Sequence, residues 1–402
     1  MAGLAVAAVG AVAVVVSLAS LQQDLAAYWV AGKTRWFSLD PYLNYGGSDV
    51  APRLWDGVAP YKHSRFLYPP LAAELFRLLA LVPYRFAKVA FTGAAVAGWL
   101  LTARLAARRP GGRSQDALAV ILGGALFFPF YFHLERGQID LLLLPLVFVA
   151  WLRRGRPVGA GAALALAATF KPALLGLLPV VVAMGRWRWA AATVGFCGAA
   201  VAVGMAISGP ALTREYTTVV LPRAALYGEG GTEDMLMHAN RLPITDDDGE
   251  LTELEGRSYK IAVPPFDRPA SASLPRRLAP TSPHWAANVL PYVFAIAGLA
   301  WAARRLARRR ADGATAGADA ELLLFTAAIL ACVVTSPTGW VMSFVWALPI
   351  APLVWTPPAR PLLRAAWIAC ALSPLIGWWT AVAGAALVAI AATAADRWRE
   401  AA

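Results

Sequence analysis

The chain has 402 residues, of which 59% are hydrophobic and only 15% are charged, and its mean hydropathy is +0.55. A soluble domain carries about a quarter charged residues, so this composition excludes an ordinary soluble protein and indicates an integral membrane protein. The formal net charge is +12, and its distribution among the connecting loops explains it without a nucleic-acid partner.

Apolar runs long enough to cross, or nearly cross, a bilayer recur along the whole chain. We predict an all-α, polytopic fold of about 12 transmembrane helices that forms one domain over residues 1–402. Several runs are short, so the regions around Lys171-Pro172 and Trp378-Trp379 can instead be re-entrant or broken helices. The runs lie near residues 2–21, 86–106, 116–133, 138–152, 157–170, 173–185, 190–208, 285–303, 320–336, 341–355, 362–378 and 380–395.

Arginine is concentrated in every second connection between these runs, and cytoplasmic loops of membrane proteins retain positive charge. The predicted cytoplasmic loops hold 18 of the 36 basic residues and six of the 24 acidic ones, whereas the opposite face is neutral overall. We therefore predict a multi-pass protein of the plasma membrane with both termini in the cytoplasm. The short basic loops show no other motif and suit contact with anionic lipid headgroups.

The two longest connections, residues 22–85 and 209–284, fall on the predicted outer face with all four histidines. The first connection mixes aromatic residues with charges, which indicates short amphipathic helices in the headgroup layer. The second contains the acidic run 246–249, which lacks the spaced ligands and the closing Glu of an EF-hand. We interpret that run as a solvated loop and predict no metal site.

Asp24 directly follows the first apolar run, where the first span leaves the bilayer. A carboxylate at that depth costs a few kcal/mol unless water or a cation compensates it, so Asp24 is a candidate functional group. Its position also fits a helix-end anchor, or an N-cap of an interfacial helix that starts at Leu25.

Three further polar segments stand at the outer ends of predicted spans. In the first, Tyr68-Pro69-Pro70-Leu71-Ala72, the two prolines prevent a helix before Leu71. The second is a tight polar turn between two spans, and the third is a lysine in an apolar region with a proline behind it. Their sequences are His133-Leu134-Glu135-Arg136-Gly137-Gln138-Ile139-Asp140 and Phe170-Lys171-Pro172.

Each of these segments also has a purely structural interpretation. Lys171 can snorkel to the interface from a helix end, and Arg136 can pair with Glu135 across a surface turn. Gln138 can cap a helix, and the Tyr68 segment can serve the architecture alone.

Taken in order, these motifs resemble glycosyltransferase family 87, membrane mannosyltransferases of the GT-C superfamily that use polyprenyl-phosphate sugars. The chain is similar to that family in its Asp after the first span, its Tyr-Pro-Pro, its Gly-Gln turn and its Lys-Pro. A late Ser-Pro-x-x-Trp is also present and ends at Trp340, which equally fits the interfacial aromatic belt. The chain departs from the pattern at Asp140, where the family usually has Asn, and in residues 341–343, where it lacks the usual His. These departures concern donor binding and the identity of the sugar.

The resemblance implies a GT-C-like enzyme that transfers a hexose or pentose, most typically mannose, from a polyprenyl-phosphate sugar with inversion. The implied acceptor is a lipid-linked or cell-envelope glycan on the outer face of the membrane. Asp24 is the expected catalytic base. The expected substrate-binding residues are Tyr68, His133, Arg136, Gln138, Asp140, Lys171, Asn240 and Trp340. The expected partners are the lipid-linked donor, the acceptor and membrane lipids, without nucleic acid, nucleotide or an essential metal cofactor.

The residues support this chemistry independently of the resemblance. Inverting transfer to a hydroxyl needs a base beside the acceptor oxygen, and a carboxylate at the membrane surface can supply it. The departing phosphate needs cationic or amide donors, which Lys171, Arg136 and Gln138 can provide.

A membrane transporter or lipid flippase without transferase activity is the main alternative. Such proteins usually place ionisable groups near the bilayer midplane and often show internal repeats, whereas here the polar clusters gather at one face and no repeat is found. A non-catalytic scaffold of a cell-envelope assembly would explain the topology, but it gives no role to Asp24 and Lys171.

Overall fold

The computed structural model describes residues 2–43, 53–54, 66–222, 273–275, 285–311, 317–336, 339–355, 361–373 and 380–397. Helices make up these segments almost entirely, which confirms the predicted all-α class within the described part of the chain. They are α1 (Ala2–Ala19), α2 (Gln23–Trp36), α4 (Pro70–Phe76), η1 (Leu79–Leu81), α5 (Tyr84–Ala107), α6 (Ser114–Ala125), α7 (Phe128–Arg136), α8 (Asp140–Leu152), α9 (Pro157–Phe170), η2 (Pro172–Leu177), α10 (Leu178–Ala183), α11 (Trp187–Ser208), α12 (Pro210–Glu215), η3 (Tyr216–Val220), α17 (Trp285–Ala311), α18 (Ala318–Val334), η4 (Val341–Ile350), α19 (Ala351–Trp355), α20 (Pro361–Ala371) and α22 (Thr380–Arg397).

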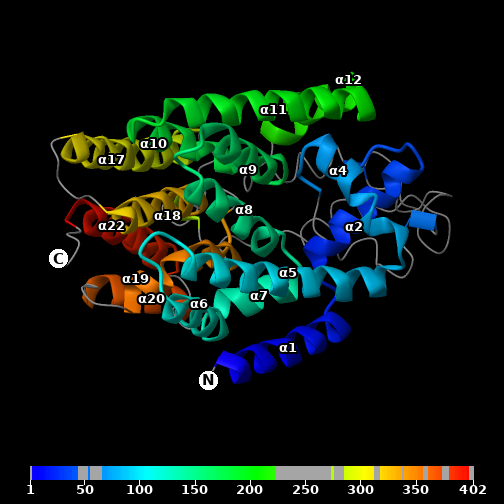
Figure 1. The fold of residues 1–402 in the computed structure, drawn as a ribbon. Coiled ribbons are helices and arrows are strands. Elements are labelled where there is room, and N and C mark those ends of the chain that lie inside the picture. The colour runs from blue at the N-terminus through cyan, green and yellow to red at the C-terminus, as the bar shows by residue number, and fades with distance from the viewer. Residues whose placement is uncertain are drawn as a thin grey trace.

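The long helices lie side by side in one bundle, with α1 on its outside against α5 and α6 (Figure 1). The short helices α2 and α4 pack against each other at one end of the bundle (Figure 1).

Four helices of the described structure are long and apolar enough to cross a bilayer by themselves: α1, α5, α11 and residues 289–309 of α17. A fifth span results if α6 and α7, which meet at a bend of 65°, are taken together. The other apolar runs are helical but short; α8, for example, has 13 residues and is about 20 Å long, against about 30 Å of hydrocarbon. The predicted count of 12 transmembrane helices is therefore not confirmed.

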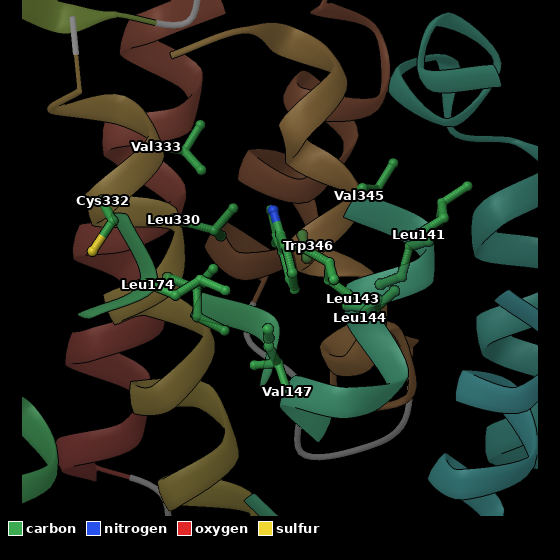
Figure 2. Close-up of a cluster of buried hydrophobic side chains, with 14 of the residues drawn as sticks. Leu141, Leu143, Leu144, Val147, Leu174, Leu330, Cys332, Val333, Val345 and Trp346 are labelled. Carbon is green, nitrogen blue, oxygen red and sulfur yellow. The ribbon is translucent and has the colours of Figure 1, made fainter. Parts of the chain in front are cut away.

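The core of the bundle lies around α18, which is buried along its whole length from Ala320 to Val334. Trp346 of η4 is fully buried, and Figure 2 shows it between Leu330 of α18 and the α8 side chains Leu143 and Leu144. A helix that is apolar on every side belongs inside a bundle, so α18 and η4 are the elements that the other helices surround.

The helices of the first connection are packed differently from the sequence expectation. We expected amphipathic helices that lie in the headgroup layer, but α2 is buried at every residue from Asp24 to Gly32. Gly32 faces α4 so closely that a Cβ atom there would stand 2.3 Å from the carbonyl oxygen of Phe76. α2 is thus an internal packing element, because its small residues admit a close neighbour.

The basic loops, in which the sequence shows no motif besides their arginines, also make specific contacts with α18. Glu321, in the first turn of α18, is 1% exposed and accepts from Arg154 at 2.5 Å and from Arg186 at 2.7 Å. Arg109 pairs with Asp116 and Asp319 in the same way. Three of these arginines therefore hold the loops onto α18 by buried ion pairs, in addition to any contact with lipid.

Candidate functional site

Asp24 lies in the first turn of α2, which begins one residue earlier, at Gln23. The chain enters this helix through Gln22, whose φ of 52° is in the left-handed region. The Gln22 side chain donates to Thr92 of α5 at 2.8 Å and to the Leu134 carbonyl of α7 at 3.1 Å. These bonds fix the start of α2 against two neighbouring helices and thereby set the position of the Asp24 carboxylate.

The predicted tight turn joins α7 to α8 and begins at Gly137, whose φ is 67°. Glycine adopts this left-handed conformation without a steric penalty and commonly ends helices. Its missing side chain matters as well, because a Cβ atom there would stand 2.6 Å from the Leu25 Cβ atom of α2. The turn can therefore approach the first turn of α2 closely.

This approach brings Arg136 and Gln138, one on each side of Gly137, onto Asp24. The Arg136 guanidinium donates from Nη2 to Oδ1 at 3.0 Å and from Nε to Oδ2 at 3.2 Å. The Gln138 amide donates to Oδ2 at 2.9 Å. Arg136 also donates to the side chain of Gln23. The Asp24 side chain is 7% exposed, whereas that of Arg136 is 24% exposed, so the cation faces outward from a buried carboxylate.

Two tyrosines extend this cluster. Tyr28, one helical turn after Asp24, donates to Oε1 of Gln138 at 3.0 Å, and its hydroxyl lies 2.7 Å from that of Tyr68. Burial raises the pKa of Tyr68, and the charges of Asp24 and Asp140 raise it further. Both hydroxyls are therefore protonated at neutral pH.

Lys171 stands in the break between α9 and η2, outside the helical conformation that a following proline disfavours. Its ammonium group donates to Asp140 at 2.6 and 2.8 Å and to Ser343 of η4 at 3.2 Å. Asp140, the first residue of α8, is fully buried. The two positions at which the chain departs from the family pattern, Asp140 and the segment after Trp340, therefore meet at one lysine.

Aromatic packing joins the two ion pairs. The Phe76 ring of α4 stacks on Tyr28, with 4.7 Å between the centroids, and contacts Phe170 edge-on at 5.7 Å. Because Phe170 precedes Lys171 and Tyr28 reaches Gln138, one ring braces both halves of the cluster.

The remaining sequence candidates are placed as follows. His133 is fully buried in α7, and its Nε2 atom accepts from the Leu141 backbone N–H at 3.1 Å, which satisfies a free donor at the start of α8. Trp340 directly precedes η4 and is partly buried. Asn240 lies outside the described residues, as do the acidic run 246–249 and the other three histidines.

The sequence did not single out three residues of this cluster. Tyr28 stands four residues after Asp24 within α2, and this helical spacing is the signal that could have identified it. Gln23 directly precedes Asp24, a spacing at which helical side chains do not face each other, so it carries no such signal. Ser343 is 172 residues from Lys171 and carries no local signal. Within the described residues, no three His, Cys, Asp or Glu side chains are grouped so that they could hold a metal ion.

The model of glycosyltransferase family 87 matches residues 66–242, which include Tyr68, the α7–α8 turn and Lys171. This match supports glycosyltransferase family 87 as the family of the chain. The family match and the apolar helices indicate a membrane glycosyltransferase, which acts with a sugar donor and an acceptor. No curated protein and no solved structure matches the chain significantly.

Proposed function

We propose that the protein transfers a sugar, most typically mannose, from a polyprenyl-phosphate donor to a lipid-linked or cell-envelope glycan acceptor, with inversion. The observation that supports this most strongly is that three separate motifs meet in one cluster. Asp24 binds Arg136 and Gln138 of the α7–α8 turn, and Lys171 binds Asp140, where the same turn enters α8. The proposed site is on the outer face of the plasma membrane, where the outer connections and a lipid-borne donor would meet.

In the proposed reaction, the acceptor hydroxyl oxygen forms a bond to the anomeric carbon of the donor sugar. The bond from that carbon to the phosphate oxygen breaks, and polyprenyl phosphate leaves. Asp24 removes the proton of the attacking hydroxyl, and Arg136 and Lys171 neutralise the departing phosphate. Such cations are most effective when they are fixed before the charge develops.

The bidentate contact between Arg136 and Asp24 adds a condition to this scheme. The Arg136 guanidinium donates to both oxygens of the Asp24 carboxylate, so the carboxylate is available to the acceptor hydroxyl when Arg136 turns to the donor phosphate. Arg136 is the more exposed partner of the pair and can meet an incoming phosphate without unfolding the turn. Donor binding would then precede deprotonation of the acceptor.

We propose that no metal ion is needed, because each acid of the site already has a cationic partner in Arg136 or Lys171. These cations can balance the phosphate charge that a divalent ion would otherwise balance. No nucleotide sugar is needed either, because the phosphodiester of the lipid donor drives the transfer.

Purified protein in lipid vesicles, supplied with radiolabelled polyprenyl-phosphate sugars, tests the proposal. We expect transfer in the presence of a chelator, none from GDP- or UDP-sugars, and a loss of about 10²- to 10⁴-fold for Asp24→Asn. Glu135→Gln, which changes an exposed acid beside Arg136, is the control. The proposal fails if Asp24→Asn keeps more than about half of the wild-type rate, or if activity lost to the chelator returns with Mg²⁺ or Mn²⁺.

A further inference from the structure

The orientation of the Gln138 amide is determined by its neighbour Asp24. A carboxylate that binds a guanidinium is ionised and can only accept hydrogen bonds, so Gln138 must present its NH₂ group to it. The amide oxygen then points away and needs a donor of its own. Tyr28 supplies that donor at 3.0 Å.

The same reasoning fixes the bond between the two tyrosines, in which either hydroxyl could donate by geometry alone. A tyrosine hydroxyl has one proton, and Tyr28 gives its proton to Gln138. Tyr28 must therefore accept from Tyr68, which lies 2.7 Å away. Every donor in the series Tyr68, Tyr28, Gln138 points toward Asp24.

We propose that Tyr28 is a positioning residue that acts through Gln138 on Asp24, and that the Tyr68 oxygen accepts a hydrogen bond from a sugar hydroxyl. This inference rests on the proposed function, since it assigns Asp24 the role of base. Without the Tyr28 hydroxyl, nothing in the series holds the Gln138 amide in the orientation that suits the carboxylate. Tyr28 is 1% exposed, so it meets no substrate itself.

The proposed ligand of Tyr68 follows from the fact that its hydroxyl already donates its one proton to Tyr28. Its oxygen can accept but has no donor left, and a phosphate group at neutral pH offers mainly acceptors. A sugar hydroxyl, in contrast, can donate. Tyr68 is a partly buried residue whose hydroxyl ends the series on the side away from Asp24, so the proposed contact with the sugar is at this end.

A double-mutant cycle between Tyr28→Phe and Gln138→Met tests the positioning role. The loss of one neutral hydrogen bond corresponds to a fall in kcat of about 3- to 10-fold for Tyr28→Phe, with the donor KM nearly unchanged. If Tyr28 acts through Gln138, the double variant is no slower than Gln138→Met alone. If the two effects multiply, Tyr28 only packs, and the proposal is wrong.

Tyr42→Phe is the matched control, because Tyr42 is also buried and donates at 2.8 Å to the Tyr68 carbonyl, outside the series. Its effect should multiply with that of Gln138→Met. The same double-mutant cycles can be measured by thermal unfolding, which needs no substrate. Suppose that Tyr28 and Gln138 are coupled in unfolding while Asp24→Asn is fully active. The hydrogen-bond series then stands, but the proposed function is overturned.

Inhibition by polyprenyl phosphate, the donor without its sugar, tests the assignment of Tyr68. Tyr68→Phe should leave the inhibition constant of this lipid within about 2-fold of wild type. It should raise the KM of the sugar-bearing donor or of the acceptor by about 3- to 10-fold. A weaker inhibition constant in Tyr68→Phe would place Tyr68 on the phosphate and overturn the assignment.

Discussion

At the scale of single residues, Gly137 determines whether the Arg136 and Gln138 side chains can reach Asp24. Gly137→Ala adds a Cβ atom 2.6 Å from that of Leu25 and places alanine at a φ of 67°. The left-handed conformation alone costs about 1–2 kcal/mol. The contact also pushes the turn away from α2, so we expect turnover to fall about 10²-fold, as misplaced catalytic groups do.

Gly111→Ala is the control for this variant. Gly111 has a similar φ of 74°, but no atom lies within 4 Å of its added Cβ. It should lose only the stability that the left-handed conformation costs and keep full turnover in the vesicle assay. Equal turnover in both variants would mean that the close approach of the turn to α2 is not needed.

Lys171 needs a test that separates its charge from its support of Asp140. Lys171→Met leaves a fully buried carboxylate without its cation, and such a broken pair costs about 3–5 kcal/mol. We therefore expect low folded yield from Lys171→Met and recovery of the yield in Lys171→Met/Asp140→Asn. Turnover of the recovered double variant should remain low because the phosphate lacks its cation. Ser343→Ala is the reference, because it removes the other partner of Lys171 and keeps the cation. Restored turnover would reduce Lys171 to a structural partner.

At the scale of elements, α18 is anchored through one acid. Glu321→Gln leaves Arg154 and Arg186 without a carboxylate, and both arginines are less than a quarter exposed. Because their remaining exposure lets water compensate in part, we expect a loss of about 2–3 kcal/mol in the free energy of unfolding. Thermal unfolding in detergent measures it, with the exposed Glu135→Gln expected within about 0.5 kcal/mol of wild type. Equal stability of the two variants would contradict a structural role for the arginine loops.

Local signals predicted individual elements well where proline or glycine determines the backbone. The Tyr68-Pro69-Pro70 segment does delay a helix, although α4 begins at Pro70 because proline fits the first helical position. The turn at Gly137 and the break before Pro172 were also expected from the sequence. Hydrophobicity located the apolar helices but could not distinguish a span from a short core helix such as α8, since both are uniformly apolar.

Contacts between elements could not be predicted from the sequence, for a different reason. The sequence suggested Glu135 as the partner of Arg136, because nearby charges are the only ones that a linear pattern can pair. The structure pairs Arg136 with Asp24, 112 residues away, and Lys171 with Asp140. The packing of α2 against the α7–α8 turn creates the first pair, and the packing of α8 against α9 creates the second.

At the scale of the whole molecule, the distribution of charge predicts which end of the bundle faces the cytoplasm. Ser38, just beyond α2, and Gly155, in a basic loop, are both exposed and lie on opposite predicted faces. We expect Ser38→Cys to react with a membrane-impermeant maleimide in intact cells, and Gly155→Cys to react only after permeabilisation. The three native cysteines, which are free, are replaced by alanine in both proteins. The reverse labelling pattern would place the site in the cytoplasm.

The ion pairs of Glu321 also have a consequence for the order in which the protein assembles during synthesis. Arg154 and Arg186 leave the ribosome 167 and 135 residues before the carboxylate that they bind. On the predicted cytoplasmic face, anionic headgroups can serve both arginines as counterions until Glu321 follows. We therefore expect membranes poor in anionic lipid to hinder the docking of α18 more than the insertion of the earlier helices.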